Sequence, residues 1–493
     1  MNSARRTDNT MADDPASRWQ RREGMALLTD FYELTMLSGY LKHGLAERRV
    51  AFEYFFRTLP PHTGFVLSAG LDSFLSYLEH LRFSDADLAY LESLRFFDRA
   101  TLDYLAAFKP DLEIHAVAEG TPVFPHEPVV RVVGPLPHAQ LVEAFLLNAL
   151  NYQSLIATKT ARICLAAQGE PVMEFGLRRA QGPDGSLSGS RAAYIGGAVA
   201  TSNVLAGRLF GIPVRGTHAH SWVMSFPGEK EAFEAFADSF PQGCVLLVDT
   251  YHPLKSGVPN AIQVFKARPQ VPPAIRLDSG DLAKLSKAAY RLFCQAGLPD
   301  VRIVGTNDLD EDLIADLKRQ GAKINTWAVG THLITSKDHP ALDGVYKLVA
   351  LEKDGQWLPR LKLSGNPEKT TDPGLKRPLR CYNSDRQPLG DILLAETEPM
   401  PAGSDLRSYD RRFLMPKQLA QVAFTEELLH PVFVQGRRVA PALPAADIRA
   451  RAQTALAAFP EEYLRLRNPE IYWLGLSEML AKTKQEALRA VGD

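Results

Sequence analysis

The chain has 493 residues, of which 45% are hydrophobic, and its formal net charge is -1 at pH 7. This length can bury a large core and suggests two or three domains. The balance of charge excludes an overall basic surface of the kind that holds nucleic acid or an anionic membrane, so small-molecule chemistry is favoured.

The four cysteines are far apart and form no C-x-x-C pair, which indicates neither a zinc site nor a disulfide framework. Residues 1–24 are mostly polar and are expected to be a disordered tail. No stretch reaches the roughly 18 consecutive apolar residues of a membrane span. We therefore expect a cytoplasmic protein without a membrane partner.

The first part of the chain mixes helix and strand patterns. LLTDFYELTMLSGYL, which begins at Leu27, carries apolar residues at helical spacing, with Asp30 and Glu33 placed as a capping pair. RVAFEYFFRTL then alternates apolar residues on one face, as a strand does. From about Arg380 a linker-like stretch is followed by helical segments. We expect a smaller α/β domain from 25–140 with 396–493, and a catalytic domain over 141–395.

The middle of the chain repeats a short apolar run, a polar or glycine-containing turn and a helical stretch. The runs begin near Pro171, Pro213, Cys244, Ala274, Val301, Ile324 and Val345. This spacing is typical of βα units with a parallel sheet, and predicts an irregular, TIM-like α/β barrel.

Residues with reactive side chains follow these runs. They are Arg178 and Arg179, His218 and His220, Asp249, Asp278, Asn307 and Asp308, and Thr331. In an α/β barrel the carboxyl ends of the strands face the active site, so we expect these side chains to converge there.

The sequence GTHAHS, at 216–221, combines a glycine, the hydroxyl of Thr217 and the imidazole of His220, which together suit a bound phosphate or carboxylate. His218 and His220 also form an H-x-H pair, which ligates a catalytic metal in some barrel hydrolases. The later strand ends supply carboxylates but no histidine at a convincing ligand position. A metal-dependent hydrolase is therefore the less favoured alternative.

The sequence RLDSGDL, at 276–282, lies where a strand gives way to a helix. Ser279 and Gly280 can present backbone N–H groups to an anion there. Asp278 is placed to bind Mg²⁺ or to orient an imidazole, whereas Asp281 is expected to cap the helix.

Three other strand ends carry groups that bind phosphate. Arg178 stands beside a glycine-rich loop and can hold phosphate oxygens in two hydrogen bonds. Asn307 follows a later strand, and Gly330 with Thr331 ends the next, where barrels often bind phosphate. Neither G-x-G-x-x-G nor G-x-x-x-x-G-K-[ST] occurs, so the standard dinucleotide and P-loop sites are absent from the sequence.

Several long motifs stand in one order along the chain: LLTDFYELTM, EFGLRRAQGPDG, SNVLAG, GTHAHS, VDTY, KSGVPN, RLDSGDL and GVYKLVA. By their order and spacing the chain closely resembles the nicotinate phosphoribosyltransferases, over nearly everything after the tail. The resemblance implies a type II phosphoribosyltransferase fold, with an irregular barrel and a smaller domain built from both chain ends. It also implies a homodimer with a shared active site.

The implied reaction joins nicotinate to 5-phosphoribosyl 1-diphosphate and gives nicotinate mononucleotide and diphosphate, the first step of NAD salvage from nicotinate. In the family, ATP phosphorylates the histidine of G-T-x-A-H-S, here His220, and His218 stands at the variable position. Mg²⁺ neutralises the departing diphosphate, and Asp278 is a candidate ligand.

The resemblance also implies roles in binding. Tyr32 would stack on the nicotinate ring, from the partner chain. Arg276 and Thr217 would hold the ring carboxylate, and Thr331 the phosphate of the phosphoribosyl group.

Two alternatives remain beside the hydrolase. Nicotinamide phosphoribosyltransferases share the fold and the histidine but differ in the ring pocket, and the long motifs favour nicotinate. A catalytically silent metabolite-binding protein would have little need for Arg276, His220 and Asp278 together.

Overall fold

The computed structural model describes residues 22, 24–365 and 369–492. The chain forms two compact units: unit 1 is Met1–Leu155 with Ala341–Asp493, and unit 2 is Ile156–Pro340. It passes from unit 1 to unit 2 within helix α7 (Glu143–Ala167). The domain boundaries at 140/141 and 395/396 stay a prediction. The expected disordered tail falls on residues 1–21 and 23, which lie outside the described residues.

Unit 2 contains a parallel sheet, as predicted. In its described part the order is β7 (Ala200–Thr201), β6 (Val172–Glu174), β11 (Thr326–Val329), β10 (Arg302–Gly305), β9 (Ala274–Leu277) and β8 (Leu246–Leu247). All these pairings are parallel. Because β7 and β8 are consecutive in the chain but lie at opposite edges, the order is that of a barrel left open between them.

Two details of the predicted strand set change. The run near Pro213 forms no strand, and only a parallel bridge joins Val214 to Thr201. β7, which the sequence reading missed, takes the place beside β6. It is only two residues long, too short to show a pattern.

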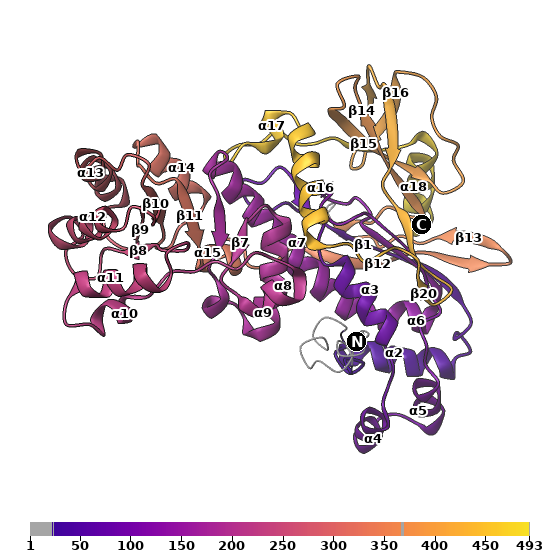
Figure 1. Ribbon diagram of the computed structural model, residues 1–493. Coiled ribbons are helices and arrows are strands. Elements are labelled where there is room, and N and C mark those ends of the chain that lie inside the picture. The colour runs from indigo at the N-terminus through magenta and orange to yellow at the C-terminus, as the bar shows by residue number, and fades with distance from the viewer. Residues whose placement is uncertain (1–21, 23, 366–368, 493) are drawn as a thin grey trace, which may run out of the picture. The chain divides into compact units, whose positions relative to one another are not determined.

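Helices lie between and around the strands of unit 2, with α11 to α14 surrounding β8 to β11 (Figure 1). Its helices are α8 (Gly182–Ile195), α9 (Val204–Phe210), α10 (His220–Met224), α11 (Glu229–Ser239), α12 (Val258–Ala267), α13 (Leu282–Gln295), α14 (Glu311–Arg319) and α15 (Thr331–Ile334), with short helices η1 (Leu177–Arg179) and η2 (Pro253–Gly257). This cover suits strands that are mostly buried, as parallel sheets require.

Unit 1 is built on an antiparallel sheet. Its described strands follow the order β13 (Gln356–Pro359), β12 (Gly344–Lys353), β1 (Arg49–Phe56), β5 (Val130–Pro135), β3 (Glu113–Ala116), β19 (His430–Val434) and β20 (Arg437–Arg438). The prediction that the run near Val345 is a parallel barrel strand is therefore wrong, because β12 pairs antiparallel with β1. Tyr346 stacks there on Phe52, with ring centroids 4.7 Å apart. A short apolar run fits either kind of buried strand, which explains the error.

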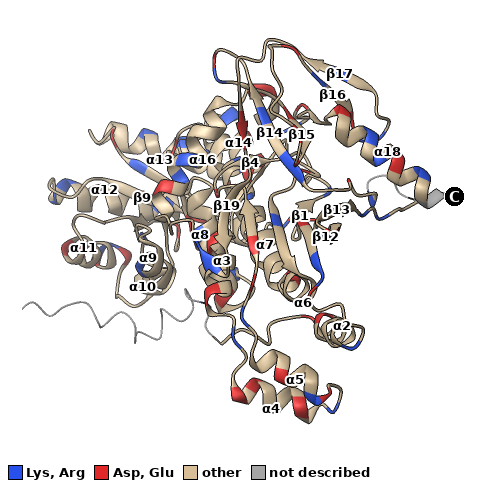
Figure 2. Cartoon of the chain, turned by 90° about the vertical axis from the view of Figure 1, so that its right-hand side faces the viewer, with Lys and Arg blue, Asp and Glu red and all other residues tan. Residues whose placement is uncertain are grey.

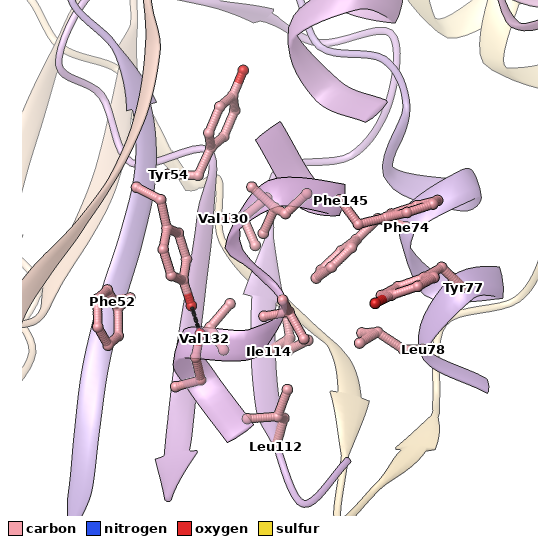
Figure 3. Packing of buried hydrophobic residues seen from close by; sticks show 14 of the residues in the cluster. Phe52, Tyr54, Phe74, Tyr77, Leu78, Leu112, Ile114, Val130, Val132 and Phe145 are labelled. Atoms are coloured by element: carbon pink, nitrogen blue, oxygen red, sulfur yellow. Dashed lines mark hydrogen bonds between the residues drawn. The ribbon is translucent and has the colours of Figure 1, made fainter. Parts of the chain in front are cut away.

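Helices cover this sheet and close its core. They are α2 (Phe31–Lys42), α3 (Leu71–His80), α4 (Asp85–Ser93), α5 (Arg99–Ala106) and α6 (Leu136–Leu141). The unit also contains α16 (Ala445–Ala458) and α17 (Glu461–Leu464). Phe74 and Tyr77 of α3 face Ile114 and Val130 of the strands (Figure 3). The predicted first helix is confirmed as α2, although the Asp30 side chain makes no cap hydrogen bond.

The C-terminal part of unit 1 contains a second sheet that the sequence reading missed. Its described strands are β17 (Pro416–Leu419), β16 (Leu406–Asp410), β21 (Leu474–Leu476), β15 (Pro388–Ala395), β14 (Lys376–Tyr382) and β18 (Phe424–Glu427), followed by helix α18 (Glu478–Gly492); β2 (Val66–Leu67) and β4 (Pro122–Val123) form a small ladder elsewhere in the unit. Arg380 and Asp391 form a buried ion pair between β14 and β15, at 2.7 Å. Charged side chains of this kind hide the strand pattern in the sequence.

The fold is thus α/β, with one unit built from both chain ends, as expected. Segments of Lys and Arg are interspersed with segments of Asp and Glu (Figure 2). Within the described residues, no helix is long and apolar enough to cross a membrane.

Candidate active site

Arg276 organises a cluster of polar side chains in unit 2. It projects from β9, and its three guanidinium nitrogens donate to different partners: Nε to Thr306 Oγ1 at 3.1 Å, Nη1 to Thr217 Oγ1 at 3.0 Å and Nη2 to Asp278 Oδ1 at 3.0 Å. Three of its five N–H groups are engaged in this way, so two remain for a ligand. The guanidinium is therefore oriented before any ligand binds.

His220 is the first residue of α10 and belongs to the same cluster. Its Nδ1 lies 3.1 Å from Thr250 Oγ1, and its Nε2 lies 3.7 Å from Asp278 Oδ2. The side chain is 41% exposed, so a substrate can reach it. Oriented on both sides yet accessible, the imidazole can act as a nucleophile or a base.

Asp249 anchors the turn that carries Asp278. Its Oδ2 accepts from the backbone N–H of Asp278 and from Ser279 Oγ, both at 2.7 Å. Its Oδ1 is buried, with no hydrogen-bond partner among the described residues. Gly280 follows at φ +73°, and Asp281 accepts from Lys284 N–H, which confirms its predicted role as a helix cap.

The structure thus joins four of the predicted site residues by direct side-chain contacts: Thr217, His220, Arg276 and Asp278. A fifth, Ser279, is linked to them through Asp249. Sequence reasoning missed what Asp249, Thr250 and Thr306 contribute. Asp249 was recognised only as a strand-end residue. Thr250 lies in VDTY and Thr306 in GTND, so motif position was the available signal for both.

The remaining predicted residues of unit 2 lie at the carboxyl ends of other strands. Arg178 is exposed in η1 after β6, Asn307 follows β10, and Gly330 with Thr331 follows β11. None of the hydrogen bonds described links them to the Arg276 cluster, but the carboxyl ends of parallel strands share one edge of a sheet. Asn307 has φ +87°, a conformation that non-glycine residues rarely adopt and that recurs at functional sites.

Glu174 holds the turn that carries Arg178, and sequence reasoning missed it too. This carboxylate is fully buried at the end of β6 and accepts from Thr201 Oγ1 at 2.6 Å, from Ser190 Oγ at 2.9 Å and from the N–H of Gly176. A Cβ at Gly176 would lie 2.5 Å from the Cβ of Ile334, so only glycine fits this turn.

His218 does not share a ligand position with His220. Its Nε2 accepts from the N–H of Leu247 at 3.1 Å, and its ring packs edge-on against Phe236. Burial lowers the pKa of His218 to about 4, so the ring is neutral at pH 7. Among the residues that the structure describes, no group of three or more His, Cys, Asp or Glu is placed to hold a metal ion. The different partners of His218 and His220 therefore do not support the H-x-H metal site of the less favoured hydrolase alternative.

Tyr32 lies in unit 1, on α2, and its side chain is exposed. It is not one of the residues that form the cluster in unit 2. Leu28, Phe31 and Met36 are exposed beside it in the sequence. Its predicted stacking on a nicotinate ring stays a prediction.

Comparison with known proteins places this chain among enzymes that transfer phosphoribosyl groups. The nicotinate phosphoribosyltransferase (NAPRTase) N-terminal domain matches residues 27–151, and the nicotinate phosphoribosyltransferase C-terminal domain matches residues 375–484. The chain is 41% identical to nicotinate phosphoribosyltransferase of Bacillus subtilis over 472 residues, which are 95% of this chain and 96% of the relative.

A human protein of the same name is also similar to this chain. Nicotinate phosphoribosyltransferase of Homo sapiens is 38% identical over 528 residues, with 95% of this chain and 97% of the relative covered. The crystal structure of human nicotinic acid phosphoribosyltransferase matches with a TM-score of 0.80 at 35% identity, covering 94% of this chain and all of that one. The chain belongs to the nicotinate phosphoribosyltransferase family.

Proposed function

We propose that the protein transfers the phosphoribosyl group of 5-phosphoribosyl 1-diphosphate to nicotinate, and couples this transfer to ATP hydrolysis through a phosphohistidine at His220. The products are nicotinate mononucleotide and diphosphate, and the reaction begins NAD salvage from nicotinate. The observation that carries the proposal is the cluster of Thr217, His220, Arg276 and Asp278 in a chain from this family.

Arg276 and Thr217 are assigned to the carboxylate of nicotinate. Their side chains are 3.0 Å apart, and Arg276 retains two N–H groups beyond those bound within the protein. A planar guanidinium suits a carboxylate because it can donate two parallel hydrogen bonds. Nicotinamide lacks the negative charge and would gain less from this site.

His220 is assigned as the phosphate acceptor. When Nδ1–H donates to Thr250, the lone pair of the imidazole is on Nε2, which is the nitrogen that faces Asp278. Nε2 attacks the γ-phosphorus of ATP, the new N–P bond replaces the bond to the bridging oxygen, and ADP leaves. Phosphohistidine then improves substrate binding, and its hydrolysis drives formation of the mononucleotide.

The glycosyl transfer itself needs positioning and charge stabilisation more than covalent help. The ring nitrogen of nicotinate attacks C1 of the ribose while diphosphate leaves, through an oxocarbenium-like transition state. The residues that we assign to the phosphate groups are Arg178, Ser279, Gly280 and Asn307 for the diphosphate, and Gly330 with Thr331 for the 5-phosphate.

The cluster fits a Mg²⁺ ion bound with the diphosphate. Asp249 Oδ1 is a buried oxygen without a partner, and Asp278 lies next to it in the hydrogen-bond network. Mg²⁺ is commonly held by one or two carboxylates together with substrate phosphates, so these two residues would hold it. When bound, the ion supplies positive charge against the diphosphate as it departs.

We also propose the homodimer with a shared site. Leu28, Phe31, Tyr32 and Met36 expose apolar surface on α2 and just before it. The ring of Phe31 packs edge-on against the exposed ring of Phe96, with centroids 5.1 Å apart. Exposed apolar patches of this kind are typical of protein interfaces. A second copy that covers this patch would surround Tyr32, which fits its assigned role beside the nicotinate ring. The cytoplasmic location stays a prediction.

The test is product formation by the wild-type protein with 5-phosphoribosyl 1-diphosphate and Mg²⁺. Nicotinate, nicotinamide and quinolinate are compared, each with and without ATP. We expect mononucleotide from nicotinate alone, in higher yield with ATP. A preference for nicotinamide would overturn the ring-pocket assignment, and no reaction with any base would overturn the proposed function.

A further inference from the structure

At the edge strand β8 of the parallel sheet, a side chain accepts a backbone hydrogen bond. Among the described residues, β8 pairs with β9 and with no other strand. His218, which meets β8, belongs to the segment 215–219, and this segment has no strand structure. The N–H of Leu247 in β8 donates to Nε2 of His218 at 3.1 Å. An imidazole nitrogen thus accepts the hydrogen bond that a neighbouring strand would accept in a closed barrel.

The hydrogen bonds of His218 define its protonation state. Because Nε2 accepts, the proton of the neutral ring is on Nδ1, which lies 3.3 Å from the carbonyl oxygen of Ala219. The side chain is buried, with 6% of the residue exposed. Because burial lowers the pKa of His218 to about 4, the ring is neutral at pH 7.

The ring also packs against aromatic side chains. Phe236 of α11 meets it edge-on, with ring centroids 4.7 Å apart, and the Phe233 centroid lies at 6.2 Å. These contacts bury the imidazole, whereas the hydrogen bond to Leu247 sets the direction of Nε2.

His218 and His220 contact the same stretch of chain. His218 bonds to Leu247, and His220 bonds to Thr250 three residues later. Thr217, on the other side of His218, bonds to Arg276. His218 is therefore the buried anchor between two residues that face the site, and its bond to β8 sets the position of both.

We propose that His218 is a positioning residue: its bond to Leu247 holds 217–220 against β8 and places the imidazole of His220 to receive the phosphoryl group. The inference rests on the proposed function, because it assumes that His220 is the acceptor. It assigns His218, the first histidine of GTHAHS, a role in the reaction without contact to the substrate.

The test compares amides of different reach. In His218→Gln the side-chain oxygen can occupy the place of Nε2, whereas in His218→Asn it falls short, near the place of Nδ1. We expect the rate of His220 phosphorylation by ATP in a single turnover to stay within about twofold of wild type for Gln and to fall about tenfold for Asn, as loss of one buried hydrogen bond predicts. In both variants, the rate of phosphoribosyl transfer to nicotinate measured without ATP should change less than the rate of His220 phosphorylation.

The control is Phe236→Leu, which loosens the packing but keeps the acceptor, and it should phosphorylate at a rate near wild type. Equal rates for the Gln and Asn variants, whether high or low, would overturn the inference. So would a loss in Phe236→Leu equal to that in the Asn variant. Wild-type activity with nicotinate tests the proposed function by itself, so failure of the two ideas can be told apart.

Discussion

Removal of the Arg276 side chain should separate the binding of nicotinate from that of the phosphoribosyl donor. In Arg276→Ala the nicotinate carboxylate loses the guanidinium, while the groups assigned to the phosphates remain. Hydrogen bonds to charged groups contribute about 1.5–3 kcal/mol each. For a bidentate contact we take a net loss of about 3 kcal/mol, which is about 150-fold in affinity. We expect KM for nicotinate to rise by about that factor, and KM for 5-phosphoribosyl 1-diphosphate to rise by less than about tenfold.

The assay is initial-rate kinetics, with each substrate varied while the other is saturating. Arg302→Ala is the matched control, because Arg302 begins the neighbouring strand β10 and is exposed. Arg276→Ala also removes three hydrogen bonds within the cluster, so the thermal unfolding of this variant must be compared with that of wild type. Nicotinamide serves as a second probe, since its use should fall much less than that of nicotinate. Equal losses for nicotinate and for the phosphoribosyl donor would refute the carboxylate assignment.

Three further predictions concern the histidine, a buried support and pH. His220→Ala should abolish the stimulation by ATP and the transfer of label from γ-labelled ATP to the protein, while its melting temperature stays near wild type; retained ATP-coupled product formation would disprove the assignment. Glu174→Gln should lower the free energy of unfolding by about 2–3 kcal/mol in urea titrations. The buried carboxylate accepts three hydrogen bonds, and Gln replaces one of its oxygens by an NH2 group, which cannot accept. No change would show that the turn is held by other contacts. Burial raises the pKa of Glu33 from 4.5 to about 8. Between these two pKa values the folded chain keeps a proton on Glu33 that the unfolded chain releases. The contribution of protonated Glu33 to the free energy of unfolding is therefore present at low pH and is lost as pH rises toward 8. Between pH 5 and pH 8, Glu33 should add to the slope of the free energy of unfolding against pH by the uptake of about one proton. Glu33→Gln should remove this part of the slope, and an unchanged slope would contradict the prediction.

The parallel sheet and much of the cluster could be predicted because both follow from local pattern. Apolar runs followed by turns indicate βα units, and the carboxyl ends of β9 and its neighbours bring Arg276 and Asp278 to one edge. Thr217 reaches the same cluster from a segment that forms no strand. The cap at Asp281 is likewise a local feature. These predictions needed no knowledge of which strands are neighbours.

The errors concern pairings between distant segments. β12 has the composition of a barrel strand, and only its partner β1, far earlier in the chain, determines that it belongs to unit 1. His218 looked like a metal ligand because the sequence does not show that its Nε2 meets a free backbone N–H at an open sheet edge. The ion pair of Arg380 with Asp391 likewise gave buried strands a polar appearance.

The pairing of β1 with β12 also has a consequence for synthesis on the ribosome. About 290 residues lie between the end of β1 and the start of β12, and at about 5–20 residues per second their translation takes about 15 to 60 s. β5 can pair with one edge of β1 early, but the other edge stays open until unit 2 has been made. For that interval the nascent chain carries the apolar strand RVAFEYFF with one edge unprotected, and such an edge is a site for aggregation. Rapid folding of unit 2, which lies within that interval, shortens the delay before β12 can reach its partner.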